Sequence, residues 1–187
     1  AKNRMSHLST AQSAGQVIVA GFAAEGPSPA LQDLARAGQL GGFILFRRNL
    51  RDPQQIAEQN EQLRSLVPSQ LPAWISLDQE GGRVARLGPP VVRLPAMRVL
   101  GQLDDPALTE RAAHLLGRQL AVLGFNLNFA PVLDVDTNPH NPVIGDRSFG
   151  PEVSTVIAHA RAVAQGLARA GVVSCGKHFP GHGDTET

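Results

Sequence analysis

Residues 73–82 read Ala-Trp-Ile-Ser-Leu-Asp-Gln-Glu-Gly-Gly, a mostly apolar run that ends in a carboxylate and then two glycines. The residues up to Leu77 lack the regular polar–apolar alternation of a strand with one wet face. This predicts a strand buried on both faces, as in a parallel sheet, with Asp78 directly after its end. Further runs of the same character occur at residues 17–22, 42–46, 126–135 and 172–175.

Helical patterns lie between these runs. Residues 52–67 begin with Asp52 and Pro53, a favourable N-cap followed by a favourable first helical residue. Residues 105–123 repeat this Asp-Pro start, and residues 29–38 and 151–170 have similar apolar spacing. Strands that alternate with helices predict an α/β fold with a parallel sheet.

Two parallel architectures fit this alternation, a doubly wound open sheet and a TIM-like (β/α) barrel. The first usually carries a G-x-G-x-x-G turn after its first strand, and residues 21–26, Gly-Phe-Ala-Ala-Glu-Gly, lack that spacing. A barrel places its chemistry at the carboxyl ends of strands, where Asp78, Asp134 and Lys177 occur here. We therefore expect a TIM-like barrel. Because a whole barrel needs about 250 residues, the chain would cover about its first five β/α units, with residues 1–8 as a tail.

The composition excludes several classes of protein. With 17 Lys and Arg against 16 Asp and Glu, the chain gives no electrostatic reason to expect nucleic acid or an anionic membrane as a partner. No apolar run approaches the roughly 18 residues of a membrane span. Cys175 is the only cysteine, so no internal disulfide can form, and we expect a reducing, cytoplasmic location.

Two segments carry carboxylates at predicted strand ends. Asp78 can accept hydrogen bonds from neighbouring sugar hydroxyls, and the nearby Arg83 and Arg86 offer planar sets of donors. A strand-end turn with a surface ion pair explains this segment equally well. Asp134 and Asp136 share one face of an extended chain, and a loop-ordering role is favoured over a pair of catalytic carboxylates.

A third segment is the long irregular stretch 136–150, which holds Arg147 between turn residues. Irregular segments of about this length in compact domains are usually functional or disordered. Arg147 is placed either to reach into a pocket or to pair with a neighbouring acid and hold the loop.

The segment 176–187, Gly-Lys-His-Phe-Pro-Gly-His-Gly-Asp-Thr-Glu-Thr, is the most informative. His178, His182 and Asp184 could bind a metal, although the intervening proline and glycine disfavour the helical face that such histidines normally share. Cys175 and His178 could be a nucleophile and its base, but a lone cysteine in an apolar strand is usually inert core. We favour a ligand-binding strand end that leads into an active-site loop.

Taken together, these segments resemble glycoside hydrolase family 3, in particular its bacterial β-N-acetylhexosaminidases. The resemblance spans roughly residues 15 to 187 and rests on four patterns in the family's order: Asp-Gln-Glu-Gly-Gly-Arg-Val from residue 78, Asn-Phe-Ala-Pro-Val-Leu-Asp-Val from residue 128, Gly-Asp-Arg-Ser-Phe-Gly from residue 145, and Lys-His-Phe-Pro-Gly-His-Gly-Asp from residue 177. It implies that residues 1–187 are the N-terminal portion of one barrel domain.

The resemblance also implies an activity. A protein of this kind releases terminal, non-reducing β-linked N-acetylglucosamine with retention of configuration, usually during turnover of cell-wall muropeptides in the bacterial cytoplasm. Its partner would be a small carbohydrate, with no metal or other cofactor. By motif position, the side chains implied to bind the non-reducing sugar are Asp78, Arg86, Arg147, Lys177 and His178.

The catalytic groups are expected elsewhere. The family's nucleophilic aspartate and its acid/base histidine would both lie beyond Thr187, so no catalytic residue is expected within 1–187 and His182 is not assigned that role. The chain alone is then expected to be inactive. The alternatives are a β-glucosidase-type member of the family and a non-catalytic sugar-binding barrel fragment. We also expect unusual backbone geometry, such as a cis peptide, across residues 177–180.

Overall fold

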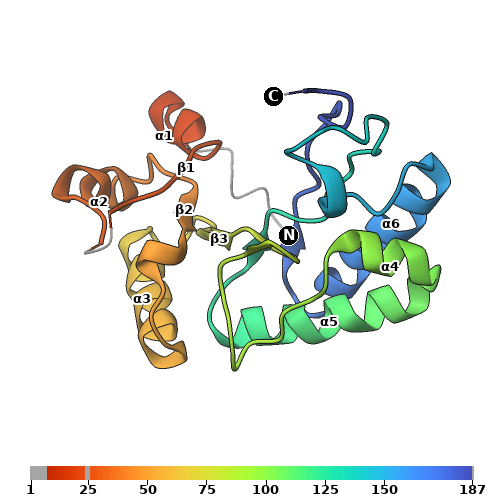
Figure 1. Ribbon diagram of the computed structural model, residues 1–187. Coiled ribbons are helices and arrows are strands. Elements are labelled where there is room, and N and C mark those ends of the chain that lie inside the picture. Colours follow the sequence, from red (N-terminus) through yellow and green to blue (C-terminus); the bar gives the residue numbers. More distant parts are fainter. Residues whose placement is uncertain (1–7, 24–25, 187) are drawn as a thin grey trace. The chain divides into compact units, whose positions relative to one another are not determined.

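The computed structural model describes residues 8–23 and 26–186, and the expected tail at 1–8 lies almost wholly outside them (Figure 1). Two units make up the chain. The first unit comprises residues 1–77 and 123–125, and the second unit comprises residues 78–122 and 126–187.

The first unit is built on three parallel strands, β1 (Val19–Ala20), β2 (Gly42–Leu45) and β3 (Trp74–Leu77), with β2 in the middle. Leu45 pairs with Leu77, and both side chains are fully buried. A Cβ on Gly42 would come within 2.2 Å of the Trp74 carbonyl oxygen, so only glycine allows this approach. Burial on both faces explains the continuous apolar runs of the sequence.

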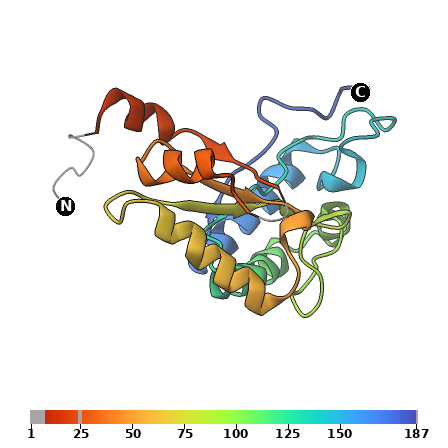
Figure 2. The same ribbon diagram turned by 90° about the vertical axis from the view of Figure 1, so that its left-hand side faces the viewer.

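Four helical segments surround these strands: α1 (Thr10–Gly15), α2 (Pro29–Arg36), the 3-10 turn η1 (Arg47–Asn49) and α3 (Pro53–Leu66). Helix α3 runs beside the strands in the view of Figure 2. The Asp52 side chain accepts a hydrogen bond from the Gln55 N–H at 2.9 Å, which caps α3 as its sequence predicts. Ile56 and Leu63 are buried on its inner face.

The second unit holds α4 (Met97–Leu103), α5 (Pro106–Val122), α6 (Val153–Arg169) and the 3-10 turn η2 (Gly145–Arg147). Helices α5 and α6 pack side by side (Figure 1). A Cβ on Gly166 would lie 2.4 Å from the Glu110 carbonyl oxygen, so this glycine sets how closely the helices approach. The short strands β6 (Leu127–Asn128) and β7 (Val173–Ser174) are parallel.

The expected helices and most of the expected strands are confirmed within a few residues, but the strand predicted at 126–135 is wrong in length. Only Leu127–Asn128 forms a strand, followed by a single bridge between Val132 and Lys177. Pro131, which has no N–H to donate, lies between the strand and this bridge, and its carbonyl accepts a hydrogen bond from the Lys177 N–H at 3.0 Å. The antiparallel hairpin β4 (Gln79–Gly81) and β5 (Val84–Ala85) and the helices α1 and α4 are not anticipated from the sequence.

Within the described residues, no helix combines the length and the apolar character that a membrane crossing requires.

Candidate functional site

Asp78 follows the end of β3 and opens the second unit. Its Oδ1 accepts a hydrogen bond from Lys177 Nζ at 2.7 Å, and its Oδ2 accepts one from Arg86 Nη2 at 3.1 Å. Burial acts to raise the pKa of Asp78. The hydrogen bonds and charges of Lys177 and Arg86 outweigh that effect, so the pKa lies below its ordinary value. Asp78 is therefore an ionised acceptor held between two donors.

Glu80 is the residue that joins the cluster together, and the sequence interpretation assigns it no role. Its Oε1 and Oε2 accept hydrogen bonds from Arg147 Nη2 and Nε, each at 2.9 Å, and Oε1 also lies 2.6 Å from Lys177 Nζ. The Glu80 side chain is only 2% exposed. The available signal was its spacing, because residues 78 and 80 share one face of an extended chain.

The β4–β5 hairpin brings Arg86 back to Asp78. The buried Gln79 side chain accepts hydrogen bonds through Oε1 from the N–H groups of Arg86 and Leu87, at 2.8 and 3.0 Å. On its other side, the Gln79 backbone exchanges two 2.9 Å hydrogen bonds with the Asn128 amide. Gln79 thus fixes the hairpin to the strand region that leads to Asp134.

Arg147 lies on η2, within the irregular segment predicted to be functional. Its side chain is 12% exposed, and its hydrogen bonds to Glu80 raise its pKa despite burial. Arg83 supports the same segment by donating to the carbonyls of Val143 and Ile144, at 2.6 and 3.1 Å. Arg83 therefore supports the loop. Arg147 pairs with the acid Glu80, as the second of its two local interpretations expects.

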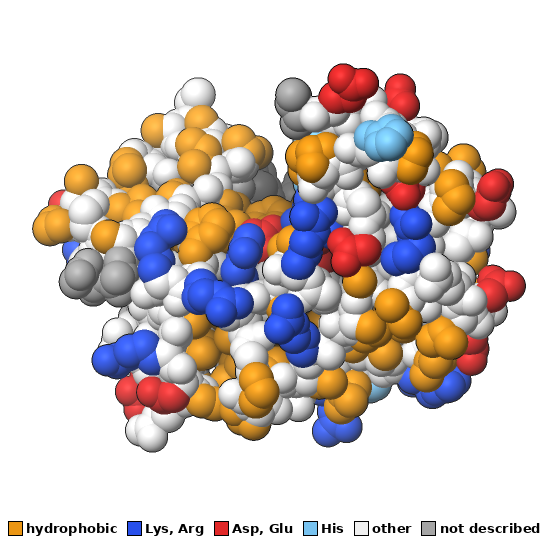
Figure 3. Space-filling view, viewed as in Figure 1, with side chains coloured by type: hydrophobic (Ala, Val, Ile, Leu, Met, Phe, Trp, Pro, Cys, Tyr) orange, Lys and Arg blue, Asp and Glu red, His pale blue; other side chains and the backbone are white. Residues whose placement is uncertain are grey.

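Arg98 of α4 also contacts this loop. Its guanidinium forms an ion pair with Asp136 and donates to the Gly145 carbonyl at 3.2 Å. Figure 3 shows basic and acidic side chains side by side on the face over α4 and the neighbouring loop. The favoured loop-ordering role of Asp136 agrees with this contact.

Asp134 organises the segment after β7. Its side chain is fully buried, and it accepts hydrogen bonds from His178 Nδ1 at 2.7 Å and from the His182 N–H at 2.6 Å. The peptide bonds Lys177–His178 and Phe179–Pro180 are both cis, which confirms the expectation of unusual backbone geometry there. The structure thus brings Asp78, Arg86, Arg147 and Lys177 into one bonded cluster, whereas His178 bonds to Asp134 instead.

The competing interpretations fare differently. No group of three or more His, Cys, Asp or Glu side chains among residues 8–23 and 26–186 is arranged to hold a metal, and Asp184 instead accepts a hydrogen bond from Thr137 at 3.3 Å. The expectation that Cys175 is core is wrong, because its side chain is exposed next to the two-residue strand β7.

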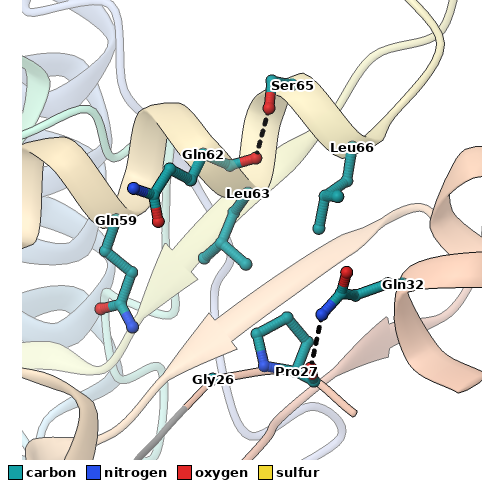
Figure 4. A pocket seen from close by; sticks show the side chains of 8 residues that line it. All are labelled: Gly26, Pro27, Gln32, Gln59, Gln62, Leu63, Ser65 and Leu66. Atoms are coloured by element: carbon teal, nitrogen blue, oxygen red, sulfur yellow. Dashed lines mark hydrogen bonds between the residues drawn. The ribbon is translucent and has the colours of Figure 1, made fainter. Parts of the chain in front are cut away.

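Two cavities accompany these elements. One, of about 450 Å³, lies between residues 133–137 and 180–185 of the second unit, against Asp134. The other, of about 310 Å³, lies in the first unit between α2 and α3 (Figure 4). Its lining includes Gln32, Gln59 and Gln62 and, among the described residues, no ionisable side chain. Gln32 already donates to the Pro27 carbonyl at 3.0 Å. Of these two cavities, we therefore relate the one in the second unit to the charged groups.

Residues 11–187 match the family described as "Glycosyl hydrolase family 3 N terminal domain". The chain belongs to glycosyl hydrolase family 3. Among family 3 relatives, a β-hexosaminidase of Neisseria gonorrhoeae is 44% identical over 154 residues, and one of Chromobacterium violaceum is 42% identical over 153 residues. Each match covers 79% of this chain but 42% of the relative, so the chain spans less than half of either protein.

Solved family 3 structures agree with this placement. A β-N-acetylglucosaminidase from Paenibacillus sp. str. FPU-7 superimposes with a TM-score of 0.90 at 42% identity, covering 96% of this chain and 35% of that one. NagZ from Neisseria gonorrhoeae, in complex with N-trifluoroacetyl-D-glucosamine, gives a TM-score of 0.81 at 38% identity, covering 89% and 50%. The expected α/β fold of the TIM-like barrel type is confirmed, and the family 3 chain carries part of that barrel.

Proposed function

We propose that the intact protein containing this chain is a retaining glycosidase that releases terminal β-linked N-acetylglucosamine. In this proposal Asp78, Arg86, Arg147, Lys177 and His178 bind the non-reducing sugar. The observation that carries it is the bonded cluster of Asp78, Lys177, Glu80 and Arg147. Further support comes from the family membership and from relatives named β-hexosaminidase at 42–44% identity.

The chemistry of the cluster suits a sugar ring. The Asp78 carboxylate accepts hydrogen bonds from hydroxyls, while Arg147 and Lys177 donate to them. The hydroxyls of a pyranose move as the ring flattens toward an oxocarbenium-like transition state. Contacts that strengthen during that movement lower the barrier, whereas contacts that hold substrate and transition state equally only improve binding. A rigid cluster therefore favours catalysis as well as recognition.

Bond cleavage with retention needs two further groups, a nucleophile and an acid/base. We place both outside these 187 residues, as the family resemblance implies. A histidine suits the acid/base role because its ordinary pKa is near neutrality. The chain would then supply the sugar-binding part of the site and no complete catalytic set.

The biological setting proposed is turnover of cell-wall muropeptides in the cytoplasm. Support comes from the β-N-acetylglucosaminidase activity named for the Paenibacillus structure and from the single cysteine, which permits no internal disulfide. Assaying muropeptide hydrolysis, and locating the protein by cell fractionation, tests each part separately.

The activity itself is tested by incubating the intact protein with a chromogenic β-N-acetylglucosaminide and the matching β-glucoside. Release from the first is expected. Release from the glucoside alone would move the protein to the β-glucosidase branch, and sugar binding without turnover would make it a binding module. Arg147→Lys should lower kcat/KM at least about tenfold, because lysine cannot form the two-point contact that Arg147 makes with Glu80. Arg169→Lys, at a surface ion pair with Glu110, is the matched control.

A further inference from the structure

The Asp134 carboxylate is fully buried, and the charge of Arg147 reaches it only at longer range. Among the described residues, no Lys or Arg nitrogen lies within ion-pair distance of it, and its only such partner is His178. Instead, its two oxygens receive three hydrogen bonds. The His178 N–H and Nδ1 donate to Oδ2 at 3.2 and 2.7 Å, and the His182 N–H donates to Oδ1 at 2.6 Å.

This arrangement determines which nitrogen of the His178 ring carries the proton. An ionised carboxylate can only accept, so Nδ1 must be the donor in the 2.7 Å contact. In a neutral imidazole the other nitrogen, Nε2, then has a free lone pair. Nε2 forms no hydrogen bond within residues 8–23 and 26–186, and the His178 side chain is 36% exposed. His178 can therefore present an acceptor to a ligand.

Lys177 and His178 therefore offer different hydrogen-bonding groups to a ligand. Lys177 is a donor only, whereas a His178 held in this way is an acceptor at its exposed nitrogen. The same carboxylate also binds the backbone of His182, so the ring and the loop that follows are held by one buried group. Because Asp134 bonds the backbone N–H of His178 as well as its ring, it restricts both the position and the rotation of that ring.

We propose that Asp134 is a positioning residue that keeps Nδ1 of His178 protonated, so that Nε2 of the neutral form of the ring accepts a hydrogen bond from a hydroxyl of the sugar. The identity of the ligand rests on the proposed function, whereas the tautomer does not. The inference thus adds a requirement to the site. One hydroxyl of the ligand must act as a donor, in addition to those that accept from Lys177 and Arg147.

The tautomer is tested by ¹⁵N NMR of ring-labelled histidine in the intact protein, with the His178 signals assigned through His178→Gln. We expect Nδ1 protonated and Nε2 unprotonated at a pH where the ring is neutral. A His178 ring that is mainly Nε2–H in the native protein would overturn the proposal, without any need for a stable variant.

Asp134→Asn replaces the charged acceptor by one neutral oxygen facing three donors, and we expect it to shift His178 toward the Nε2–H form. The control is Asp184→Asn, the same substitution on the exposed part of the following loop, which contacts Thr137 and not His178. It should leave the His178 signals unchanged. Equal His178 spectra in native and Asp134→Asn protein would also overturn the proposal.

The acceptor role is tested with N-acetylglucosamine and its 3-, 4- and 6-deoxyfluoro analogues, because fluorine cannot donate a hydrogen bond. In the native protein one analogue should bind about tenfold more weakly, the size of one hydrogen bond, and Asp134→Asn should reduce that difference. Three analogues that bind as tightly as the parent sugar would refute the acceptor role. If the native protein binds no N-acetylglucosamine, the proposed function fails, and the spectra still decide the role of Asp134 in the tautomer.

Discussion

Glu80 accepts two hydrogen bonds from Arg147, with Oε1–Nη2 and Oε2–Nε distances of 2.9 Å each, although the two residues are 67 positions apart in the chain. Their side chains are 2% and 12% exposed. The pair therefore joins strand β4 of the second unit to the long irregular loop of that unit, at a place where both side chains are largely shielded from water.

Replacing Glu80 by Gln should destabilise the protein strongly. The substitution leaves Arg147 and Lys177 largely buried without their shared carboxylate, and removing one partner of a buried pair costs about 3–5 kcal/mol. Glu110→Gln removes the partner of Arg169, which is 63% exposed, and should cost no more than about 1 kcal/mol. Urea unfolding of both variants measures the difference, and similar losses would contradict the structural role given to Glu80.

Asp78→Asn should show that the ionised Asp78 carboxylate stabilises the fold and that this contribution is lost in acid. The pKa of Asp78 is lower in the folded protein than in the unfolded chain, so its ionised form stabilises the fold above the unfolded value of about 3.9. That contribution is lost as the pH falls through the folded pKa. The free energy of unfolding of native protein minus that of the variant should therefore be constant near pH 6 and shrink below about pH 4. A difference that grows in acid would be the opposite sign.

His159 of α6 should make the fold sensitive to mild acid. It is fully buried, its Nδ1 lies 2.9 Å from Thr109 Oγ1, and its ring stacks on Phe149. Among the described residues, its Nε2 has no hydrogen-bond partner. Burial lowers its pKa despite the nearby Asp104 and Asp105. Below about pH 6.5 the His159 ring therefore binds a proton more readily in the unfolded chain than in the folded protein. The free energy of unfolding falls as the pH drops below that value.

Phe in place of His159 removes that titration and the unpaired nitrogen. The slope of unfolding free energy against pH between 5 and 6.5 should decrease by up to about 1.4 kcal/mol per pH unit. His140→Gln, at an exposed position, is the matched control. Chemical denaturation at several pH values provides the measurement, and an unchanged slope in His159→Phe would show that His159 does not titrate as argued.

Gly183→Ala should disturb the segment that follows His182. A Cβ at this position would lie 1.7 Å from the Val135 carbonyl oxygen, which is backbone and cannot move aside cheaply. Overpacking of this kind typically costs about 1–3 kcal/mol, and thermal unfolding should record it. Gly88→Ala serves as the comparison and should be close to neutral, because no described atom beyond the two adjacent residues lies within 4 Å of the added Cβ.

Much of the architecture could be predicted because its signals are local. Helices α3 and α5 each begin with Asp-Pro, and the aspartate side chain accepts a hydrogen bond from an N–H of the first helical turn. The start of each helix can therefore be predicted from its own residues. Helix α4 escaped prediction because its N-cap position is Ala96, which makes no side-chain cap, and Gly101 interrupts its pattern. Helix α1 did carry a signal, a serine followed three residues later by a glutamine (Ser9 and Gln12), directly after the residues expected to form the tail.

The site, too, has a part that could be predicted from the sequence and a part that could not. Asp78 and Lys177 could be predicted to lie close together because each follows a strand of the expected parallel sheet. The carboxyl ends of such strands meet at one edge of the sheet. The role of Glu80 could not be predicted, since it depends on where Arg147 of a distant irregular loop comes to rest. The favoured loop-ordering role for Asp134 agrees with the structure, but the ring that it orients is visible only in three dimensions.

Lys177 rests against Asp78 and Glu80 at once, and each of these acids also holds an arginine. A ligand would thus meet charges that are already paired with one another, and a single contact with the cluster would gain it little. If the cluster binds a sugar as proposed, a ring whose several hydroxyls engage these groups together would gain more than water or a small alcohol, so the resting pairs would favour whole sugar rings.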